Sequence, residues 1–408
     1  MTEWKTYRLG ELVRVKGGKR LPKGTSLQIA PNTHPYIRIR DMGKSRVLEL
    51  DATYEYVDDV TQKSIARYVV DEGDILLSIV GTIGLVGIVG KSLHQANQTE
   101  NCVKLVNLNG IDPLFLYYFL LSPKGQEEIK RGTVGAVQAK LPIKNIENIE
   151  ISLPPLKEQR RIAGILGAID DKIENNRRIN TNLELQAQAL YKQWFVDNRS
   201  DDWEEKPLSE IADFIGGYSY KGNELVESSS TAMATIKNFE RKGGFKVDGF
   251  KDIVASSKLK AEQHAELFDI LVAHTDLTQN ADVIGNAEIL LTFGCYTDII
   301  FSMDLVKVLP KSNFPYKYLL AALLKNPYFK AHCLGYVNGT TVLHMSKKAL
   351  PEYVVACPSN QDAEKMDSVF KTYYHKMAEI LQENENLATL RDTLLPKLMN
   401  GEIKPNRG

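Results

Sequence analysis

Two pairs of adjacent glycines stand beside side chains that could bind a polyanion. Four cations flank the first pair, Gly17-Gly18: Lys16, Lys19, Arg20 and Lys23. Glycine lets a backbone approach a phosphate closely, and neighbouring cations neutralise that phosphate. After the second pair, Gly216-Gly217, aromatic rings replace most of the charges: Tyr218, Tyr220 and Lys221. We interpret both turns as DNA contacts, with an ordinary surface turn as the alternative.

The first half of the chain holds further candidates for DNA contact. Arg38 and Arg40 alternate in PYIRIRD, so on a strand both would face one side, as a DNA-facing edge requires. Gln138 and Lys140 lie in the loop-like segment GAVQAK at 135–140. Arginine is the best bidentate reader of guanine and glutamine of adenine. Gln138 and Lys140 are therefore the base-reading candidates of this half.

The second half carries a matching loop, NGTTVLHMSKK, at 338–348. Five of its side chains can donate hydrogen bonds to phosphates or base edges: Thr340, Thr341, His344, Lys347 and Lys348. A single histidine is more often a structural residue, which is the alternative for His344. A further basic patch, predicted to contact phosphates, consists of Lys237, Arg241 and Lys242.

The overall charge gives no reason to expect nucleic acid, because 51 basic residues balance 51 acidic ones. The charges are nevertheless sorted along the chain. Seven basic residues and no acid lie between positions 12 and 40, and seven lysines and no acid lie between 305 and 351. Sorted charge creates locally positive surface even when the total cancels. The distribution favours DNA contact over chance solvated faces.

No motif indicates an enzyme, a cofactor site or a metal site. Walker, HExxH and GxSxG sequences are absent. GTIGLVG at 81–87 lacks dinucleotide spacing and is typical of packing and turns. NPYF at 326–329 resembles the loop with which amino-methyltransferases hold an amine, but it lacks the second proline. We interpret Asn326-Pro327 as a boundary between helix and loop.

The location predicted from the sequence is the cytoplasm. No signal peptide precedes the first domain. The apolar run at 75–89 is too short to span a bilayer and predicts buried strands with a turn. The four scattered cysteines predict buried thiols in a reducing compartment, without a metal or disulfide: Cys102, Cys295, Cys333 and Cys357.

The chain repeats itself at an interval of about half its length. Trp4 and LGEL at 9–12 recur as Trp203 and LSEI at 208–211, and the glycine pairs follow at the same interval of 199 residues. GAVQAKLPIKNI at 135–146 corresponds in the repeat to GTTVLHMSKKAL at 339–350. A duplication of this size predicts two similar mixed α/β domains. Helices are predicted at 112–132 and 315–329.

Each domain is followed by a segment with alternating four–three spacing of apolar residues, which is typical of a coiled coil. The buried seam positions of the first helix are 162, 166, 169, 173, 176, 180, 183, 187, 190 and 194, and those of the second are 204 residues later. Asn180 and Asn384 occupy equivalent seam positions, where buried asparagines commonly fix register. The predicted order is therefore domain 1–155, helix 156–198, domain 199–356, and helix with tail 357–408.

Neither amphipathic helix can bury its apolar seam alone, so the two are predicted to pack antiparallel. The predicted fold class is α+β, with two target-binding domains joined by two long antiparallel coiled-coil helices and related by a pseudo-twofold axis. Two related domains held at a fixed separation suit a bipartite site on a linear polymer such as duplex DNA.

The chain resembles the specificity subunits of type I restriction–modification enzymes. ISLPPLKEQRRIAGILGAIDDKIENNRRI at 151–179 is similar to the entry of their first conserved helix, and LLPKLMNGEI at 394–403 to the end of their second. The N-terminal W-x₄-LGEL and the order of domains also match. The second helix entry, CPSNQDAEKM at 357–366, departs from the LPPLKEQRRI of the first.

The resemblance implies a non-catalytic subunit in which each domain is a target recognition domain for one half of a split double-stranded DNA site. The helices would set the spacer and dock two adenine-N6 methyltransferase subunits. S-adenosylmethionine and ATP would then belong to partner subunits, with restriction subunits completing a nuclease. The alternative from the residues alone is a coiled-coil scaffold with two protein-binding domains and no reading of DNA sequence.

Overall fold

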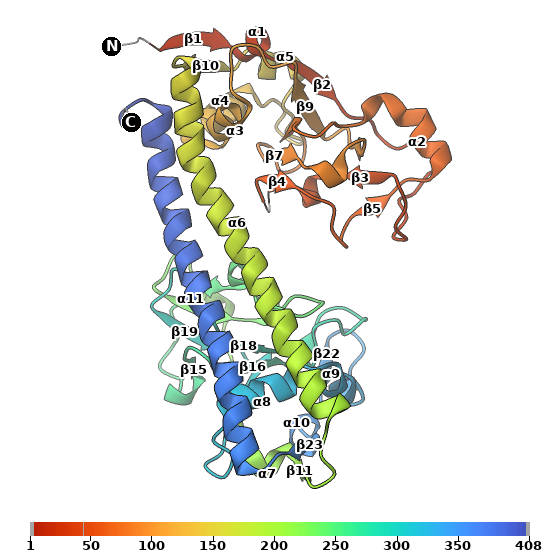
Figure 1. Cartoon of the computed structure of the whole chain (residues 1–408), viewed down its shortest axis with the longest axis vertical. Helices are drawn as coiled ribbons and strands as arrows, with labels where there is room; N and C mark the ends of the chain where they lie inside the picture. Colours follow the sequence, from red (N-terminus) through yellow and green to blue (C-terminus); the bar gives the residue numbers. More distant parts are fainter. Residues whose placement is uncertain (1–3, 44, 405–408) are drawn as a thin grey trace. The chain divides into compact units, whose positions relative to one another are not determined.

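The computed structural model describes residues 4–43 and 45–404, which divide into two compact units. Unit 1 comprises Met1–Glu174 and Leu387–Gly408, and unit 2 comprises Asn175–Asn386. Both units mix strands and helices, and each holds a stretch of the two long helices, α6 (Leu156–Lys192) and α11 (Asn360–Met399) (Figure 1). None of the helices in the described residues is both long and apolar enough to cross a membrane.

Unit 1 is built around a five-stranded sheet. Its strands lie in the order β2 (Arg14–Gly17), β9 (Cys102–Val106), β6 (Ile75–Ser78), β7 (Val86–Val89) and β4 (Val47–Leu48). All neighbours are antiparallel except β4 and β7. A second sheet consists of β5 (Glu55–Tyr56), β3 (Pro35–Ile37) and β8 (Asn97–Gln98), and a ribbon pairs β1 (Lys5–Arg8) with β10 (Glu150–Leu153). The shorter helices are α1 (Leu9–Leu12), α2 (Asp59–Ile65), α3 (Pro113–Leu121), α4 (Pro123–Gly132) and α5 (Ile143–Glu147).

Unit 2 repeats this topology. Its first sheet has the order β12 (Ala212–Gly216), β20 (Leu305–Pro310), β16 (Ile270–Ala273) and β18 (Ala287–Ile289), again antiparallel. The second is β14 (Lys251–Asp252), β13 (Thr231–Ala234), β19 (Asp298–Phe301) and β15 (His264–Ala265). Smaller groups are β17 (Thr275–Asp276) with β22 (Leu343–Met345) and β21 (Val337–Asn338), and β11 (Glu204–Pro207) with β23 (Val354–Cys357). The shorter helices are α7 (Leu208–Ile211), α8 (Lys317–Leu324), α9 (Pro327–Leu334) and α10 (Ala349–Glu352).

The apolar run at 75–89 forms the buried strand pair that its composition predicts. Strands β6 and β7 lie at its two ends, and β6 is buried along its whole length. The turn between them contains Gly81 and Gly84, both with φ near +80° to +93°, a conformation that favours glycine. The prediction of strands and a turn is confirmed, and GTIGLVG serves packing.

The two predicted domain helices are each broken in two, so those predictions are wrong in extent. The segment 112–132 divides at Ser122, whose hydroxyl accepts a hydrogen bond from the Gly125 N–H at 3.2 Å and starts α4. Pro123 has no N–H to continue the first helix. Within the segment 315–329, helix α8 ends at Leu324. Asn326 then caps α9, because its side-chain oxygen accepts a hydrogen bond from the Tyr328 N–H at 2.8 Å. The boundary predicted at Asn326-Pro327 is confirmed.

The broken helices pack their apolar residues against the long helices. In unit 1, Phe115 and Leu116 of α3 are fully buried in one cluster with Ile162 and Leu166 of α6. In unit 2, α8 lies in a cluster with Ala187 of α6 and with residues of α11. Every seam position predicted on α6 and α11 is buried or half-buried. The four–three spacing therefore identified the faces that are withdrawn from water.

The prediction of a shared register role for Asn180 and Asn384 needs correction. Asn384 Oδ1 accepts a hydrogen bond at 2.9 Å from Nδ2 of Asn176, not of Asn180. Asn180 Nδ2 instead donates to the Met377 carbonyl at 3.2 Å. Contacts from 176 to 384 and from 180 to 377 require opposite helix directions within unit 2. In that arrangement, equivalence by sequence repeat does not make two residues neighbours.

The cysteines are mostly as predicted. Cys102, Cys333 and Cys357 are buried free thiols, whereas Cys295 is exposed. Burial raises the pKa of the Cys102 and Cys333 thiols to about 12, so both stay protonated at neutral pH. The prediction of a buried thiol is wrong for Cys295, which lies in the turn before β19.

Candidate nucleic-acid interface

The glycine pairs let one strand end pass directly against another. After β2, the Gly18 N–H donates to the Cys102 carbonyl at 3.2 Å, and a Cβ at this position would lie 2.0 Å from the Thr99 oxygen. In unit 2 the Gly217 N–H donates to the Leu305 carbonyl at 3.2 Å, and a Cβ would again lie 2.0 Å from a backbone oxygen, that of Ser302. The second glycine of each pair is therefore required by this chain crossing, and the close approach of the pairs to phosphate stays a prediction.

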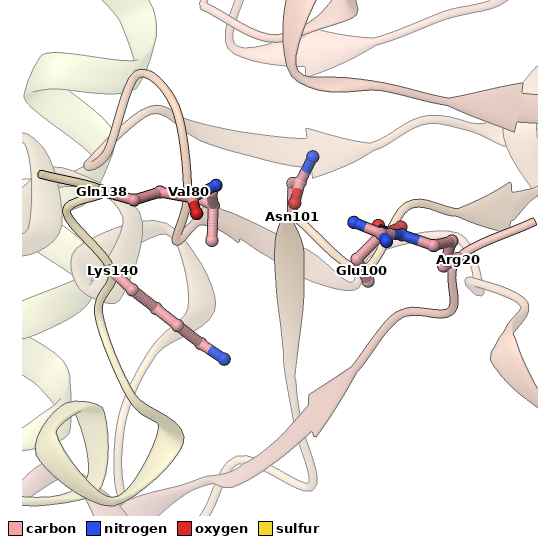
Figure 2. A pocket seen from close by; sticks show the side chains of 6 residues that line it. All are labelled: Arg20, Val80, Glu100, Asn101, Gln138 and Lys140. Carbon is pink, nitrogen blue, oxygen red and sulfur yellow. Dashed lines mark hydrogen bonds and ion pairs between the residues drawn. The ribbon is translucent and has the colours of Figure 1, made fainter.

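Beyond the first glycine pair lies a polar pocket, which we call the unit 1 pocket, with a volume of about 280 Å³. It is lined by Arg20, Val80, Glu100, Asn101, Gln138 and Lys140. Figure 2 shows Arg20 beside Glu100 on one side, Gln138 and Lys140 on the other, and Asn101 between them. Three residues predicted from distant parts of the sequence, Arg20, Gln138 and Lys140, are thus brought to one place.

Gln138 and Lys140 belong to a tight turn, residues 134–140, which we call the first hairpin. Val134 and Lys140 exchange two backbone hydrogen bonds, of 2.8 and 2.9 Å. Gly135 has φ +97°, and a Cβ there would meet the Gln138 carbonyl oxygen at 2.7 Å. The hairpin is tied to the domain because Leu141 N–H donates to the Ile79 carbonyl at 2.9 Å. Its base is fixed by backbone contacts, and its tip is presented to solvent with Val137 fully exposed.

An ion pair fixes the other side of the pocket. Arg20 Nε donates to Glu100 Oε1 at 2.6 Å, and the Thr99 hydroxyl donates to Glu100 Oε2 at 3.2 Å. Burial alone would raise the pKa of the Glu100 carboxyl, but hydrogen bonds from Arg20, its own backbone N–H and Thr99 lower it below its usual value. Glu100 is therefore ionised, and the guanidinium is held at its Nε edge.

The remaining basic residues of the first turn do not line this pocket. Lys16, on β2, and Lys19 and Lys23, after it, are all exposed. Lys19 Nζ lies 5.8 Å from the centre of the Tyr68 ring, within range of a cation–π contact. These three ammonium groups remain accessible to a phosphate backbone.

The prediction that Arg38 and Arg40 face DNA from a strand is wrong. Strand β3 ends at Ile37, and Arg38 precedes a 3₁₀ turn at Ile39–Asp41. Both guanidinium groups contact the same carboxylate, Glu55, with Arg40 Nη2 at 3.0 Å from Oε1. The Asp41 carboxylate, which is buried, turns the chain by accepting from the Arg38 N–H at 2.7 Å. The positions of both arginines are therefore determined by the carboxylates of Glu55 and Asp41, and not by alternation along a strand.

Unit 2 carries an equivalent turn, residues 337–345, which we call the second hairpin. Gly339 has φ +119°, and a Cβ there would meet the Val342 carbonyl oxygen at 2.3 Å. His344 pairs with Thr275 of β17, as Lys140 pairs with Val80 in unit 1. Five candidates in and after this hairpin are exposed: Thr340, Thr341, His344, Lys347 and Lys348. The sequence predictions for this loop coincide with its accessible face.

Below the second hairpin lies a histidine that the sequence interpretation missed. Burial, followed by the positive charges of His344 and Lys347, lowers the pKa of the half-buried His274 imidazole, although Asp304 opposes the shift. Thr275 Oγ1 donates to Asp304 Oδ1 at 2.9 Å, so a carboxylate stands beside the hairpin as Asn101 does in unit 1. Gln279, also missed, donates to the Thr340 carbonyl at 2.7 Å.

The aromatic residues after the second glycine pair are not a DNA-facing set. Tyr218 is buried, with its hydroxyl 2.6 Å from Glu224 Oε1, so the prediction of an accessible ring is wrong. Tyr220 is half-buried against Lys251, whose Nζ lies 5.6 Å from the ring centre. Lys221 is exposed. Tyr218 packs in an apolar cluster with Met233 and Ile300, whereas the equivalent Lys19 of unit 1 is exposed.

The basic patch of Lys237, Arg241 and Lys242 is exposed as a group. Arg241 Nε lies 3.6 Å from Asp282 Oδ2, which leaves the two lysines as the accessible charges. The turn is closed by Glu240 N–H donating to the Gly244 carbonyl at 2.9 Å.

Glu100, Asn101 and Val80 of the unit 1 pocket were not predicted from the sequence. A signal for them existed, because the repeat places VKL at 103–105 opposite VKV at 306–308. The residues just before that strand face the glycine pair in both units. The strand end opposite each glycine pair was therefore identifiable as a pocket wall.

Comparison with known proteins connects this arrangement to a family. Residues 1–185 match the family described as Type I restriction modification DNA specificity domain. A type I restriction enzyme MjaIX specificity subunit from Methanocaldococcus jannaschii is 22% identical, over 98% of this chain and 94% of the relative. The HindI specificity subunit from Haemophilus influenzae is 23% identical, over 99% of this chain and 100% of the relative. Residues 1–185 match that family, and the chain over nearly its full length is similar to type I specificity subunits.

The fold agrees with that similarity. The crystal structure of a type I restriction–modification S subunit from M. genitalium covers 100% of this chain and 97% of its own, with a TM-score of 0.54 and 19% identity. This likeness concerns the fold, with its mixed strands and helices and its long helix. The family match and the names of these relatives point to DNA target recognition and not to catalysis.

Proposed function

We propose that this specificity subunit directs its complex to a bipartite double-stranded DNA site, with each unit reading one half. The observation that carries the proposal is the repetition of one construction in both units. In each, a glycine pair passes a strand end, and a glycine-based hairpin presents polar side chains above it. A hairpin with a fixed base and an exposed polar tip suits the reading of base edges.

The proposal assigns the surrounding lysines to the DNA backbone. Lys16, Lys19 and Lys23 flank the glycine pair of unit 1, Lys347 and Lys348 follow the second hairpin of unit 2, and all five are exposed. Backbone contacts of this kind supply affinity without sequence information. The hairpin side chains would then discriminate among sequences that the lysines hold equally well.

The long helices are proposed to set the spacer between half-sites and to dock two methyltransferase subunits. Such subunits would bind S-adenosylmethionine and methylate adenine, and restriction subunits would supply the ATP-dependent nuclease. The chain itself would then need no cofactor. The proposed place of action is the cytoplasm, because the proposed ligand is cellular DNA.

The experiment is adenine methylation across genomic DNA, with and without this chain, in the presence of its methyltransferase subunit. We expect N6-methyladenine at one split motif with a constant gap and one mark in each half. The matched control is the methyltransferase subunit alone. Methylation that is the same with and without the chain would overturn the proposal and favour a coiled-coil scaffold that binds proteins.

A further inference from the structure

We infer that Arg20 reads a guanine in the half-site bound by unit 1, and that Glu100 is the positioning residue for its guanidinium. The inference rests on the proposed function and deepens it. It also changes the role of Arg20, because the sequence alone assigned Arg20 to the phosphate backbone with the neighbouring lysines.

The first argument is the geometry of the ion pair. Arg20 Nε donates a hydrogen bond to Glu100 Oε1 at 2.6 Å. Among the described residues, no hydrogen bond is made by its two terminal nitrogens, and 83% of its side chain is exposed. Two terminal nitrogens held in one plane match the O6 and N7 acceptors of guanine. The side of the guanidinium that is left open is the side that reads guanine.

The second argument is that Glu100 is itself held in place. Its side chain is only 31% exposed, and its second oxygen accepts from the Thr99 hydroxyl at 3.2 Å. Its backbone follows Thr99, whose carbonyl packs against Gly18. A carboxylate fixed at both oxygens limits the rotation of the arginine that it binds. Preorganisation of this kind improves selectivity because less side-chain entropy is lost when the base is bound.

The third argument is electrostatic. A carboxylate 2.6 Å from the guanidinium makes the pair neutral overall and repels an approaching phosphate. Lys19, one residue earlier, is exposed and forms no ion pair with a carboxylate of the described residues, which is the environment expected of a phosphate contact. The two adjacent cations are thus chemically distinct, although their sequence patterns are alike.

The fourth argument comes from the rest of the pocket. Asn101 lies in the middle of the pocket, and Gln138 and Lys140 lie together on the side opposite Arg20 (Figure 2). These groups offer both donors and acceptors around the guanidinium, as reading of a base pair and its neighbour requires. A wall made only of cations would suit a phosphate better.

Unit 2 lacks the pair and therefore supplies an internal control. In the repeat, Ser219 of unit 2 corresponds to Arg20 of unit 1, and Met303 corresponds to Glu100. The backbone match is supported by the Lys19 N–H bond to Gln98 at 3.1 Å and the Tyr218 N–H bond to Phe301 at 2.7 Å. Changes in Arg20 or Glu100 should therefore alter one half of the DNA motif and leave the other unchanged.

The test uses the full chain in complex with its methyltransferase subunits. The methylated motif and the binding of matched DNA duplexes are measured for wild type, Arg20→Ala, Glu100→Gln and Lys19→Ala. Arg20→Ala should lower discrimination for guanine at one base pair roughly 10- to 100-fold, in one half-site only. Lys19→Ala is the matched control. It should keep the motif, weaken binding to all sequences, and flatten the salt dependence by about 0.9 in slope.

Glu100→Gln tests positioning separately from reading. It should relax the same base pair as Arg20→Ala by a smaller factor, roughly 3- to 10-fold, and should add nothing in the Arg20→Ala/Glu100→Gln double variant. A purely structural role for Glu100 would give losses that multiply in the double variant. Thermal unfolding of each variant should match wild type, because an exposed ion pair contributes little to stability.

The outcomes separate the inference from the function on which it rests. If the wild-type chain directs no sequence-specific methylation, the proposed function fails. If the wild-type motif is clear and Arg20→Ala keeps it while binding weakens uniformly with a flatter salt slope, Arg20 is a phosphate contact and the inference is overturned. Relaxation of both half-sites by Arg20→Ala would also overturn it.

Discussion

The two hairpins share a backbone and differ in nearly every side chain that could meet DNA. Gly135 and Gly339 both have positive φ, and both hairpins pair with the strand end that follows a buried strand. At equivalent positions, however, unit 1 has Lys140 where unit 2 has His344. The comparison indicates that the duplicated scaffold was kept by packing constraints, whereas the residues on it were free to change.

The units also differ in the charged residues of their interiors. Unit 2 buries an ion cluster in which Lys325 Nζ lies 2.6 Å from Glu288 Oε2 and 3.1 Å from Glu184 Oε1. The equivalent positions in unit 1 are Leu121 and Gly87. Burial disfavours the charged ammonium, but the two carboxylates outweigh burial and raise the pKa of Lys325. The same topology is thus compatible with uncharged residues in one unit and a buried charge cluster in the other.

The largest effect is expected from alanine at the second glycine of either pair, which would break the feature that the units share. Gly18→Ala and Gly217→Ala each place a Cβ 2.0 Å from a backbone carbonyl oxygen. We expect a loss of about 4 kcal/mol or more in the free energy of unfolding of that unit. Denaturant unfolding of the full chain checks this expectation.

The matched controls are the first glycines of the pairs. A Cβ at Gly216 meets nothing within 4 Å, and one at Gly17 meets only Ile143 at 3.8 Å. Gly17→Ala and Gly216→Ala should therefore leave stability nearly unchanged. Equal losses at both glycines of a pair would contradict the crossing explanation.

The next largest effect tests the difference between the cores. Lys325→Met should destabilise unit 2 by roughly 3 kcal/mol or more, because Glu288, with 5% of its side chain exposed, would lose its cation. The double variant Lys325→Met/Glu288→Gln should recover part of that loss, which chemical denaturation of both variants can measure. A double variant less stable than Lys325→Met alone would argue against an unpaired-charge explanation.

A smaller effect is expected from the first hairpin. Gln138→Ala should cost about 1–3 kcal/mol at one base pair of the half-site read by unit 1 and relax specificity there. The half-site read by unit 2 should stay the same. Sequencing of methylated DNA measures both halves in one experiment. An unchanged motif would remove Gln138 from the base-reading residues.

The smallest effect is a dependence on pH confined to unit 2. Because the folded-state pKa of His274 is lowered, the unfolded chain binds the proton more readily. His274 therefore favours folding above its unfolded pKa, near 6.5, and this contribution is lost as the pH falls toward the lowered folded value. Unit 1 has Ile79 at the equivalent position. His274→Ile should abolish the slight loss of thermal stability between pH 7 and 5, and persistence of that loss would implicate another group.

Prediction from sequence worked where a pattern depends on neighbours along the chain or on periodicity. The buried seam of α6 and α11 follows from four–three spacing, and the Asn326 cap follows from a side chain reaching the next two N–H groups. Prediction failed where a single carboxylate outside the pattern decided the outcome. Arg38 and Arg40 meet Glu55, and Tyr218 meets Glu224 across a turn. Alternation along a strand contains no information about those carboxylates.

The sequence by itself determined the duplication, the glycine positions, the helical seams and the resemblance to type I specificity subunits. These are carried by spacing along the chain and by short local contacts. Only the tertiary structure decided that Arg20, Glu100, Asn101 and Gln138 share one pocket, and that Asn384 meets Asn176. The physical reason is that strand order and helix direction bring together residues far apart in the chain. Hydrogen-bond geometry then selects which charges are paired and which stay available to DNA.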